Sequence, residues 1–192
     1  MSHLRHLVAP VLAALVAIAL AAAPAQAGKQ TTTDQKRDVY KVPFGPTTPH
    51  LVRDDRAHDI VRAGAVHNGP RLTVWLEVRR LTGSQYVATW DVRTPGNRWV
   101  LHYDTRVTPA YTSLFHGFSE VLDCDGLRGR KLPRRDRVEV SVPRSCIGNP
   151  QWVRWGASMG RETNNYALID DARLNAGFFA NKCQLGSRLR HN

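Results

Sequence analysis

The stretch RLTVWLEVRRL, residues 71–81, decides the fold class of this chain. Aliphatic residues occupy every second position from Leu72 to Val78, so an extended chain carries all of them on one face. The other face carries Thr73, Trp75, Glu77 and Arg79. This alternation predicts a β-strand with one face in a core. The Asn68–Gly69 dipeptide favours a tight turn before the strand, so residues 61–67 are the expected hairpin partner.

The same period of two continues along most of the chain. It predicts a second hairpin from residues 84–93 and 97–104, and further strands at residues 112–121, 136–142 and 151–159. No stretch after residue 30 keeps a helical period beyond two turns. We therefore predict an all-β fold, a single antiparallel β-sandwich of the jelly-roll or immunoglobulin-like type, with little helix apart from a signal peptide.

The first 27 residues have the parts of a secretory signal peptide. Arg5 supplies the positive start, residues 7–23 form an apolar run, and a small-residue cleavage site ends at Ala27. The apolar run is shorter than the ~20 residues of a membrane-spanning helix. The prediction is cleavage between Ala27 and Gly28, which would release a secreted, extracellular protein with no transmembrane segment left.

The remaining chain divides by composition. Residues 28–37 are polar and without an apolar period, so we expect a flexible N-terminal segment there. The β-sandwich domain is predicted at residues 38–182, followed by a C-terminal tail at residues 183–192.

The chain has cysteines at positions 124, 146 and 183. Export makes a disulfide the expected state of a cysteine pair. We predict the pair Cys124–Cys146, because a single strand with a turn on each side would return the two ends to each other. Such a bond would contribute about 3 kcal/mol to stability. Cys183 would then be free in a monomer, or would link two copies in a dimer.

The chain is strongly basic, with 27 Lys and Arg against 16 Asp and Glu. Two interpretations stay open: a well-charged surface, or attraction to polyanions such as anionic envelope polymers. The densest basic stretch is RGRKLPRRDR, residues 128–137, which lacks an aromatic residue for base stacking and any known nucleic-acid motif. Sequence-specific nucleic-acid binding is therefore not expected. The candidate polyanion contacts are Arg128, Arg130, Lys131, Arg134, Arg135 and Arg137.

The stretch GASMG, residues 156–160, matches the nucleophile elbow of serine hydrolases. Acids at Asp170 and Asp171 and a histidine at His191 follow in the chain order of α/β-hydrolases. The elbow also needs a helix after the serine, and the residues that follow lack a helical period. We therefore assign no catalytic residue and keep a secreted esterase using Ser158 as the alternative function.

No metal or cofactor is predicted. Asp104, Asp123 and Asp125 offer hard oxygen ligands for calcium, but DCDG, residues 123–126, is only a fragment of a calcium loop and turn chemistry explains it equally well. The histidines are too scattered for a zinc pair. They are His50, His58, His67, His102, His116 and His191 in the chain after the signal.

Trp75 is the candidate ligand contact, together with Arg79. If the aliphatic face of residues 71–81 is the core, Trp75 points outward, where a tryptophan can stack on a sugar ring. The alternative is that both faces are covered and Trp75 is simply packed.

With these strands placed, residues 55–160 resemble the β-sandwich of family 9 carbohydrate-binding modules and the related DOMON domains. The resemblance lies in HDIVRAGAVHNGPRLTVWLEVRRL, YVATWDVRTPGNRWVLHYDT and DRVEVSVPRSCIGNPQWVRWGASM. The chain also looks like small secreted proteins of GC-rich bacteria that carry a cysteine pair around the strand before VPRSC. The resemblance implies sugar binding through aromatic side chains, and haem or sugar binding for some DOMON members, but no axial Met–His pair for haem is evident here.

From export, the all-β scaffold and the basic surface, the sequence predicts a secreted, non-catalytic binding or envelope-associated module. Its partner would be a glycan or an anionic cell-envelope polymer. A structural secreted protein, dimeric through Cys183, is the other alternative.

Overall fold

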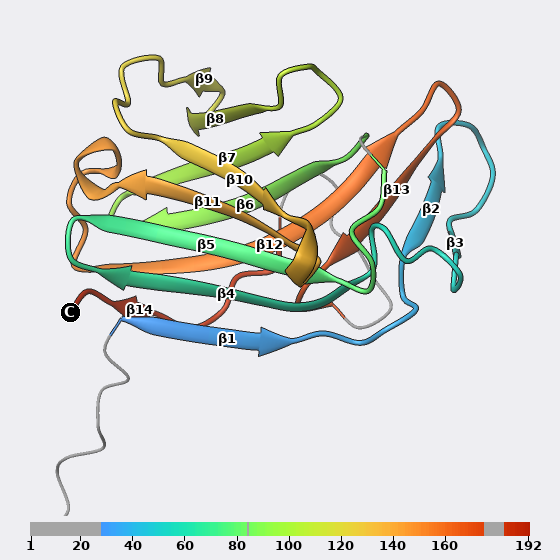
Figure 1. Ribbon diagram of the computed structural model, residues 1–192, viewed down its shortest axis with the longest axis horizontal. Helices are drawn as coiled ribbons and strands as arrows, with labels where there is room; N and C mark the ends of the chain where they lie inside the picture. Colours follow the sequence, from blue (N-terminus) through green and yellow to red (C-terminus); the bar gives the residue numbers. More distant parts are fainter. Residues whose placement is uncertain (1–27, 84, 175–182) are drawn as a thin grey trace, which may run out of the picture.

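The alternating stretch at residues 71–78 forms strand β5 at the centre of one of two antiparallel sheets that pack face to face (Figure 1). The computed structural model describes residues 28–83, 85–174 and 183–192. The predicted all-β sandwich is confirmed. In order across the sheet, the first sheet consists of β1 (Lys29–Thr33), β4 (Ile60–Asn68), β5 (Arg71–Val78), β11 (Arg137–Pro143) and β10 (Arg128–Leu132).

The second sheet has nine strands, all paired antiparallel. One of them, the short strand β14 (Leu189–Arg190), pairs with β12 outside the main strand order. Its other strands, in order, are β3 (His50–Leu51), β2 (Tyr40–Pro43), β13 (Tyr166–Asp171), β12 (Trp152–Glu162), β6 (Val87–Thr94), β7 (Asn97–Asp104), β8 (Tyr111–His116) and β9 (Ser119–Glu120). Two single turns of 3₁₀ helix, η1 (Pro133–Arg135) and η2 (Arg144–Ile147), are the only helical elements of the described residues. Among those residues, no helix has the length and apolarity needed to cross a membrane.

The core lies between the two sheets and uses the faces that the period of two predicted. From the first sheet it takes the fully buried side chains of Leu72, Val74 and Leu76. The second sheet contributes Trp90, Leu101 and Trp155, which are also fully buried. Both predicted hairpins are present, and Asn68 pairs with Arg71 across the Gly69 turn.

Residues 29–33 and 189–190 form strands of the sandwich, which therefore extends beyond the expected boundaries at residues 38 and 182. Residues 29–33 form an edge strand on β4 instead of a flexible segment, because backbone pairing does not require apolar side chains. At the other end, β14 pairs with β12 and Leu189 is 3% exposed, so residues 183–192 are not a loose tail. The predicted signal peptide and the Ala27 side of its cleavage site lie outside the described residues; Gly28 is the first described residue.

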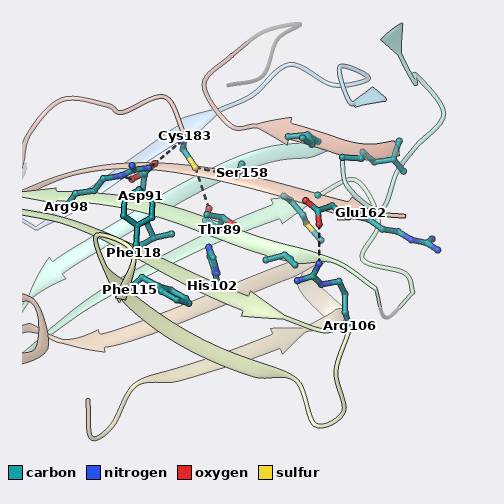
Figure 2. A pocket seen from close by; sticks show the side chains of 18 of the residues that line it. Thr89, Asp91, Arg98, His102, Arg106, Phe115, Phe118, Ser158, Glu162 and Cys183 are labelled. Atoms are coloured by element: carbon teal, nitrogen blue, oxygen red, sulfur yellow. Dashed lines mark hydrogen bonds and ion pairs between the residues drawn. The ribbon is translucent and has the colours of Figure 1, made fainter. Parts of the chain in front are cut away.

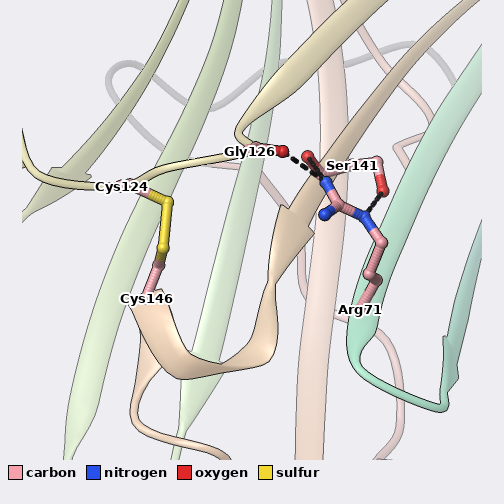
Figure 3. Close-up of a disulfide and its surroundings, with 5 residues drawn as sticks. All are labelled: Arg71, Cys124, Gly126, Ser141 and Cys146. Atoms are coloured by element: carbon pink, nitrogen blue, oxygen red, sulfur yellow. Dashed lines mark hydrogen bonds between the residues drawn. A yellow bond between two sulfur atoms is a disulfide. The ribbon is translucent and has the colours of Figure 1, made fainter.

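The predicted disulfide Cys124–Cys146 is confirmed, with the two Cα atoms 5.6 Å apart (Figure 3). Two strands, β10 and β11, lie between the cysteines where one was expected. Beside the bond, Arg71 donates to the Gly126 carbonyl and to the Ser141 hydroxyl, at 2.6 and 2.7 Å. These contacts hold the loop from Cys124 against β5 and β11.

Candidate functional site

A cavity of about 520 Å³ lies on the outer face of the nine-stranded sheet (Figure 2). Its middle is built by neighbouring strands β12, β6 and β7, where Ser158 lies opposite Thr89 and Thr89 lies opposite His102. These residues face away from the core because they alternate with the buried Ala157, Trp90 and Leu101. The volume is in the range of ~300–1,000 Å³ that small-molecule sites occupy.

Apolar and aromatic side chains form much of the cavity wall. Val100 and Ile169 contribute aliphatic surface, and Phe115 packs against the His102 ring with the two ring centroids 5.3 Å apart. Phe118, in the turn between β8 and β9, also lines the cavity but is fully exposed to solvent. An exposed phenylalanine beside a polar cavity is a surface that can stack on a ligand ring.

Three arginines line the same cavity. Arg98 forms a two-pronged ion pair with Asp91, at 2.6 and 2.8 Å, at the end of the cavity where Phe118 lies (Figure 2). Arg106 lies at the opposite end, where its guanidinium is 3.6 Å from the Glu162 carboxylate. Arg161 is exposed and makes no ion pair with any other described residue. The cavity therefore has more fixed cations than fixed anions.

Two titratable groups in the cavity are held neutral by burial. Burial lowers the pKa of His102 below its ordinary value of 6.5, and burial raises the pKa of the Cys183 thiol to about 12. The Cys183 sulfur is 3.3 Å from the Ser158 hydroxyl, and its backbone N–H donates to Asp91 at 3.0 Å. A protonated thiol at 4% exposure is a poor nucleophile and a poor partner for an intermolecular disulfide.

The GASMG stretch lies inside strand β12, with no turn and no helix at Ser158. Its glycines allow neighbouring backbone to approach. A Cβ on Gly156 would fall 2.3 Å from the Gln184 carbonyl oxygen, and one on Gly160 would fall 2.6 Å from the Leu168 carbonyl oxygen. The segment that starts at Cys183 can therefore cross over β12, which accounts for the pattern without catalysis.

Of the acids and the histidine of the elbow hypothesis, Asp171 lies opposite Ser158 on the neighbouring strand β13, but within the described residues none of the three hydrogen-bonds to the Ser158 hydroxyl. His191 is 2.9 Å from the Gly69 carbonyl oxygen through Nε2, and its ring lies edge-on to His67. Asp170 accepts from the backbone N–H of Ile60, whereas Asp171 accepts from the backbone N–H groups of Arg173 and Gln184. Within the described residues, the side chain that contacts the Ser158 hydroxyl is the Cys183 thiol and not an imidazole.

Trp75 lies on the outer face of the five-stranded sheet, as the alternation predicted, but only 5% of it is exposed. The Arg137 guanidinium lies 4.0 Å from the ring centroid, and Gly64 leaves room for the ring on the neighbouring strand. Glu77 holds Arg137 in place at 2.5 Å. Arg79, the other candidate contact, pairs with the buried Asp59. The structure therefore gives no support to a sugar platform at Trp75 and Arg79.

Some basic residues of the stretch 128–137 form ion pairs or hydrogen bonds within the protein, and others do not. Arg130 pairs with Glu139, and Lys131 donates to the Gly83 carbonyl. Of the candidate polyanion contacts, those that are exposed and form no ion pair within the described part of the chain are Arg128, Arg134 and Arg135.

The acids considered for calcium are not gathered into a site. Asp104 pairs with Arg106 at 2.7 Å, and Asp123 and Asp125 are exposed. Within the described ranges, the group of side chains close enough to share a metal ion is Asp34, Asp38 and Asp170. The sequence carried no sign of this group, because Asp170 is far along the chain from Asp34 and Asp38.

The sequence did carry a sign of the cavity that our prediction missed. Phe118 follows Gly117 inside a stretch that was expected to be one continuous strand. A glycine in an alternating stretch favours a turn, and turns run over the surface of a protein, so the Gly117–Phe118 pair was a signal for a surface aromatic residue. No protein-family model matches the chain and no curated protein matches it, so no relative assigns a role to these cavity residues.

Proposed function

We propose that this protein is a secreted, non-catalytic binding module that takes a segment of an acidic cell-envelope glycan into the cavity on its nine-stranded sheet. The observation that carries the proposal is the fully exposed Phe118 ring at the border of a cavity that Arg106 and Arg161 also line. A flat apolar ring stacks on a sugar face, and arginines bind carboxylate or phosphate groups on the same chain.

The distribution of charge supports an anionic ligand. Asp91 offsets Arg98, and Glu162 and Asp104 offset Arg106, but Arg161 has no such partner within the described residues. The whole chain carries a formal charge of +11, which attracts polyanions over distance. Secretion, which the Cys124–Cys146 disulfide favours, would bring the protein into contact with envelope polymers.

The surroundings of Ser158 support a binding role over ester hydrolysis. A nucleophilic serine needs a general base within hydrogen-bond reach, and here a buried, protonated thiol contacts the hydroxyl. A covalent serine-hydrolase probe should leave Ser158 unlabelled. Labelling at Ser158 that is lost in Ser158→Ala would replace the binding proposal with an esterase.

Binding of the purified protein to immobilised acidic and neutral glycans, measured at low and at physiological salt, tests the proposal. We expect acidic glycans to bind more tightly, and Phe118→Ala and Arg161→Ala each to weaken that binding by about tenfold, because each removes ~1.4 kcal/mol of contact. Binding to acidic glycans should also weaken as salt rises, because salt screens exposed charges.

Matched controls separate the cavity from the general charge of the protein. Phe44→Ala removes an exposed phenylalanine in the loop after β2, and Arg134→Ala removes an exposed arginine of the basic stretch 128–137. Both should bind as the wild type does. If Arg134→Ala weakens binding and Arg161→Ala does not, the basic stretch is the contact surface and the cavity is not.

A further inference from the structure

Three buried carboxylates meet where the chain passes from one sheet to the other. Asp34 and Asp38 lie between β1 of the five-stranded sheet and β2 of the nine-stranded sheet, and Asp170 lies in β13. One carboxylate oxygen from each lies within 4.8 Å of those of the other two. Asp38 and Asp170 are fully buried and Asp34 is 7% exposed, so the group lies almost out of reach of bulk water.

Hydrogen bonds with the protein satisfy only one carboxylate oxygen each of Asp34 and Asp170. Asp170 accepts from the Ile60 backbone N–H at 2.6 Å through Oδ2, but its buried Oδ1 has no partner. Asp34 accepts from the Gln35 backbone N–H at 2.9 Å through Oδ1, and its buried Oδ2 has no partner. Buried polar atoms in folded proteins almost always have one. The two partnerless oxygens therefore point to a bound group that supplies positive charge.

In the described ranges, neither Asp34 nor Asp170 forms an ion pair with an arginine, lysine or histidine. A cation among these oxygens would remove the cost of burying several carboxylates together.

We propose that Asp34, Asp38 and Asp170 bind a calcium ion that fastens the chain where it crosses from the five-stranded to the nine-stranded sheet. Calcium takes oxygen ligands at ~2.3–2.6 Å in an irregular geometry, so two oxygens on one ion lie at most about 5 Å apart. The 4.8 Å grouping fits that limit. Magnesium needs near-octahedral ligands at ~2.0–2.1 Å, and its oxygens would therefore lie at most about 4 Å apart, closer than the 4.8 Å grouping requires.

The place of the site gives the ion a structural role. Strand β1 has the sequence KQTTT, and none of its side chains is fully buried. It is held to β4 by backbone pairing at the edge of the sheet. An ion bound by Asp34 and Asp38 would tie the end of this strand to Asp170 in the interior, so that β1 resists fraying.

Titration of the EDTA-treated, dialysed protein with calcium chloride in a calorimeter tests the proposal. We expect one calcium ion per chain and an unfolding temperature several degrees higher with calcium than with EDTA. Magnesium chloride should give a clearly smaller rise. Asp34→Asn and Asp170→Asn should each bind calcium at least tenfold more weakly, whereas Asp125→Asn, which removes an exposed aspartate outside the group, should bind as the wild type does.

The asparagine variants also show whether a loss of binding is a loss of fold. Asp170→Asn keeps an acceptor for the Ile60 N–H and removes a buried charge, so in EDTA it should unfold at no lower temperature than the wild type. Absence of calcium binding by the wild type would overturn the proposal. Wild-type affinity in Asp170→Asn, or an equal response to magnesium, would overturn the assignment of these residues or of this ion.

Discussion

The outer faces of the two sheets differ in whether an aromatic side chain and the arginines near it are accessible to a ligand. On the five-stranded sheet, Arg137 covers the Trp75 ring and forms an ion pair with Glu77. Both the ring and the charge are therefore engaged by other side chains of the protein. On the nine-stranded sheet, Phe118 is fully exposed and Arg161 has no ion-pair partner within the described residues. Similar residue types therefore serve stability on one face and remain accessible to a ligand on the other, because Arg137 lies over the Trp75 ring whereas no arginine or lysine of the described residues lies over the Phe118 ring.

The largest effect on stability should come from removing Trp75, the covered aromatic residue on the outer face of the five-stranded sheet. Trp75→Ala is expected to lower the free energy of unfolding by about 4 kcal/mol, because it leaves a cavity under Arg137. Urea denaturation measures this. Glycan binding by the folded fraction should not change, whereas Phe118→Ala should reduce binding and leave stability within about 0.5 kcal/mol of the wild type. If Trp75→Ala loses glycan binding and keeps the stability of the wild type, the assignment of Trp75 to stability rather than to binding is wrong.

A second, smaller effect on stability should come from Gly156, where the segment that begins at Cys183 covers the outer face of the nine-stranded sheet. A methyl group on Gly156 would meet the Gln184 backbone at 2.3 Å, so Gly156→Ala should cost about 2–3 kcal/mol and displace the segment that begins at Cys183. Thermal unfolding measures the loss, and faster reaction of Cys183 with a thiol reagent reports the displacement. Gly45→Ala is the control, because nothing lies within 4 Å of its Cβ position. Unchanged thiol reactivity would show that residues 183–186 do not depend on Gly156.

The smallest effect should be a pH dependence from the cavity histidine. Burial keeps the pKa of His102 in the folded protein below the 6.5 of an unfolded chain. As the pH falls through 6.5, the unfolded state takes up a proton that the folded state does not, so this histidine contributes stability above 6.5 that is lost at lower pH. His102→Gln should flatten the decline between pH 7.5 and pH 5 relative to the wild type. An unaltered slope in His102→Gln would contradict the burial of this ring.

The core and the hairpins could be predicted from the sequence because they depend on local alternation. The alternating apolar residues from Leu72 to Val78 and from Ala88 to Val92 are buried, as their pattern requires, although Trp75 and Asp91 between them are buried as well. The Asn68–Gly69 turn and the Cys124–Cys146 bond followed from short separations along the chain. The edge strand Lys29–Thr33 could not be predicted in this way, since polar residues in backbone pairing leave no apolar period.

The candidate sites were decided by the tertiary structure, because each unites residues with no local relation. Trp75 was placed on the correct face from the sequence, but whether it is open or covered depends on Arg137 on another strand. Phe118, Arg106 and Arg161 become one cavity surface only once β12, β6, β7 and β8 are laid side by side. The same holds for Asp34 and Asp170, which the sequence separates and the sheet crossing brings together. Period and turn chemistry act between neighbours in the chain, whereas burial, ion pairing and shared ligands act between neighbours in space.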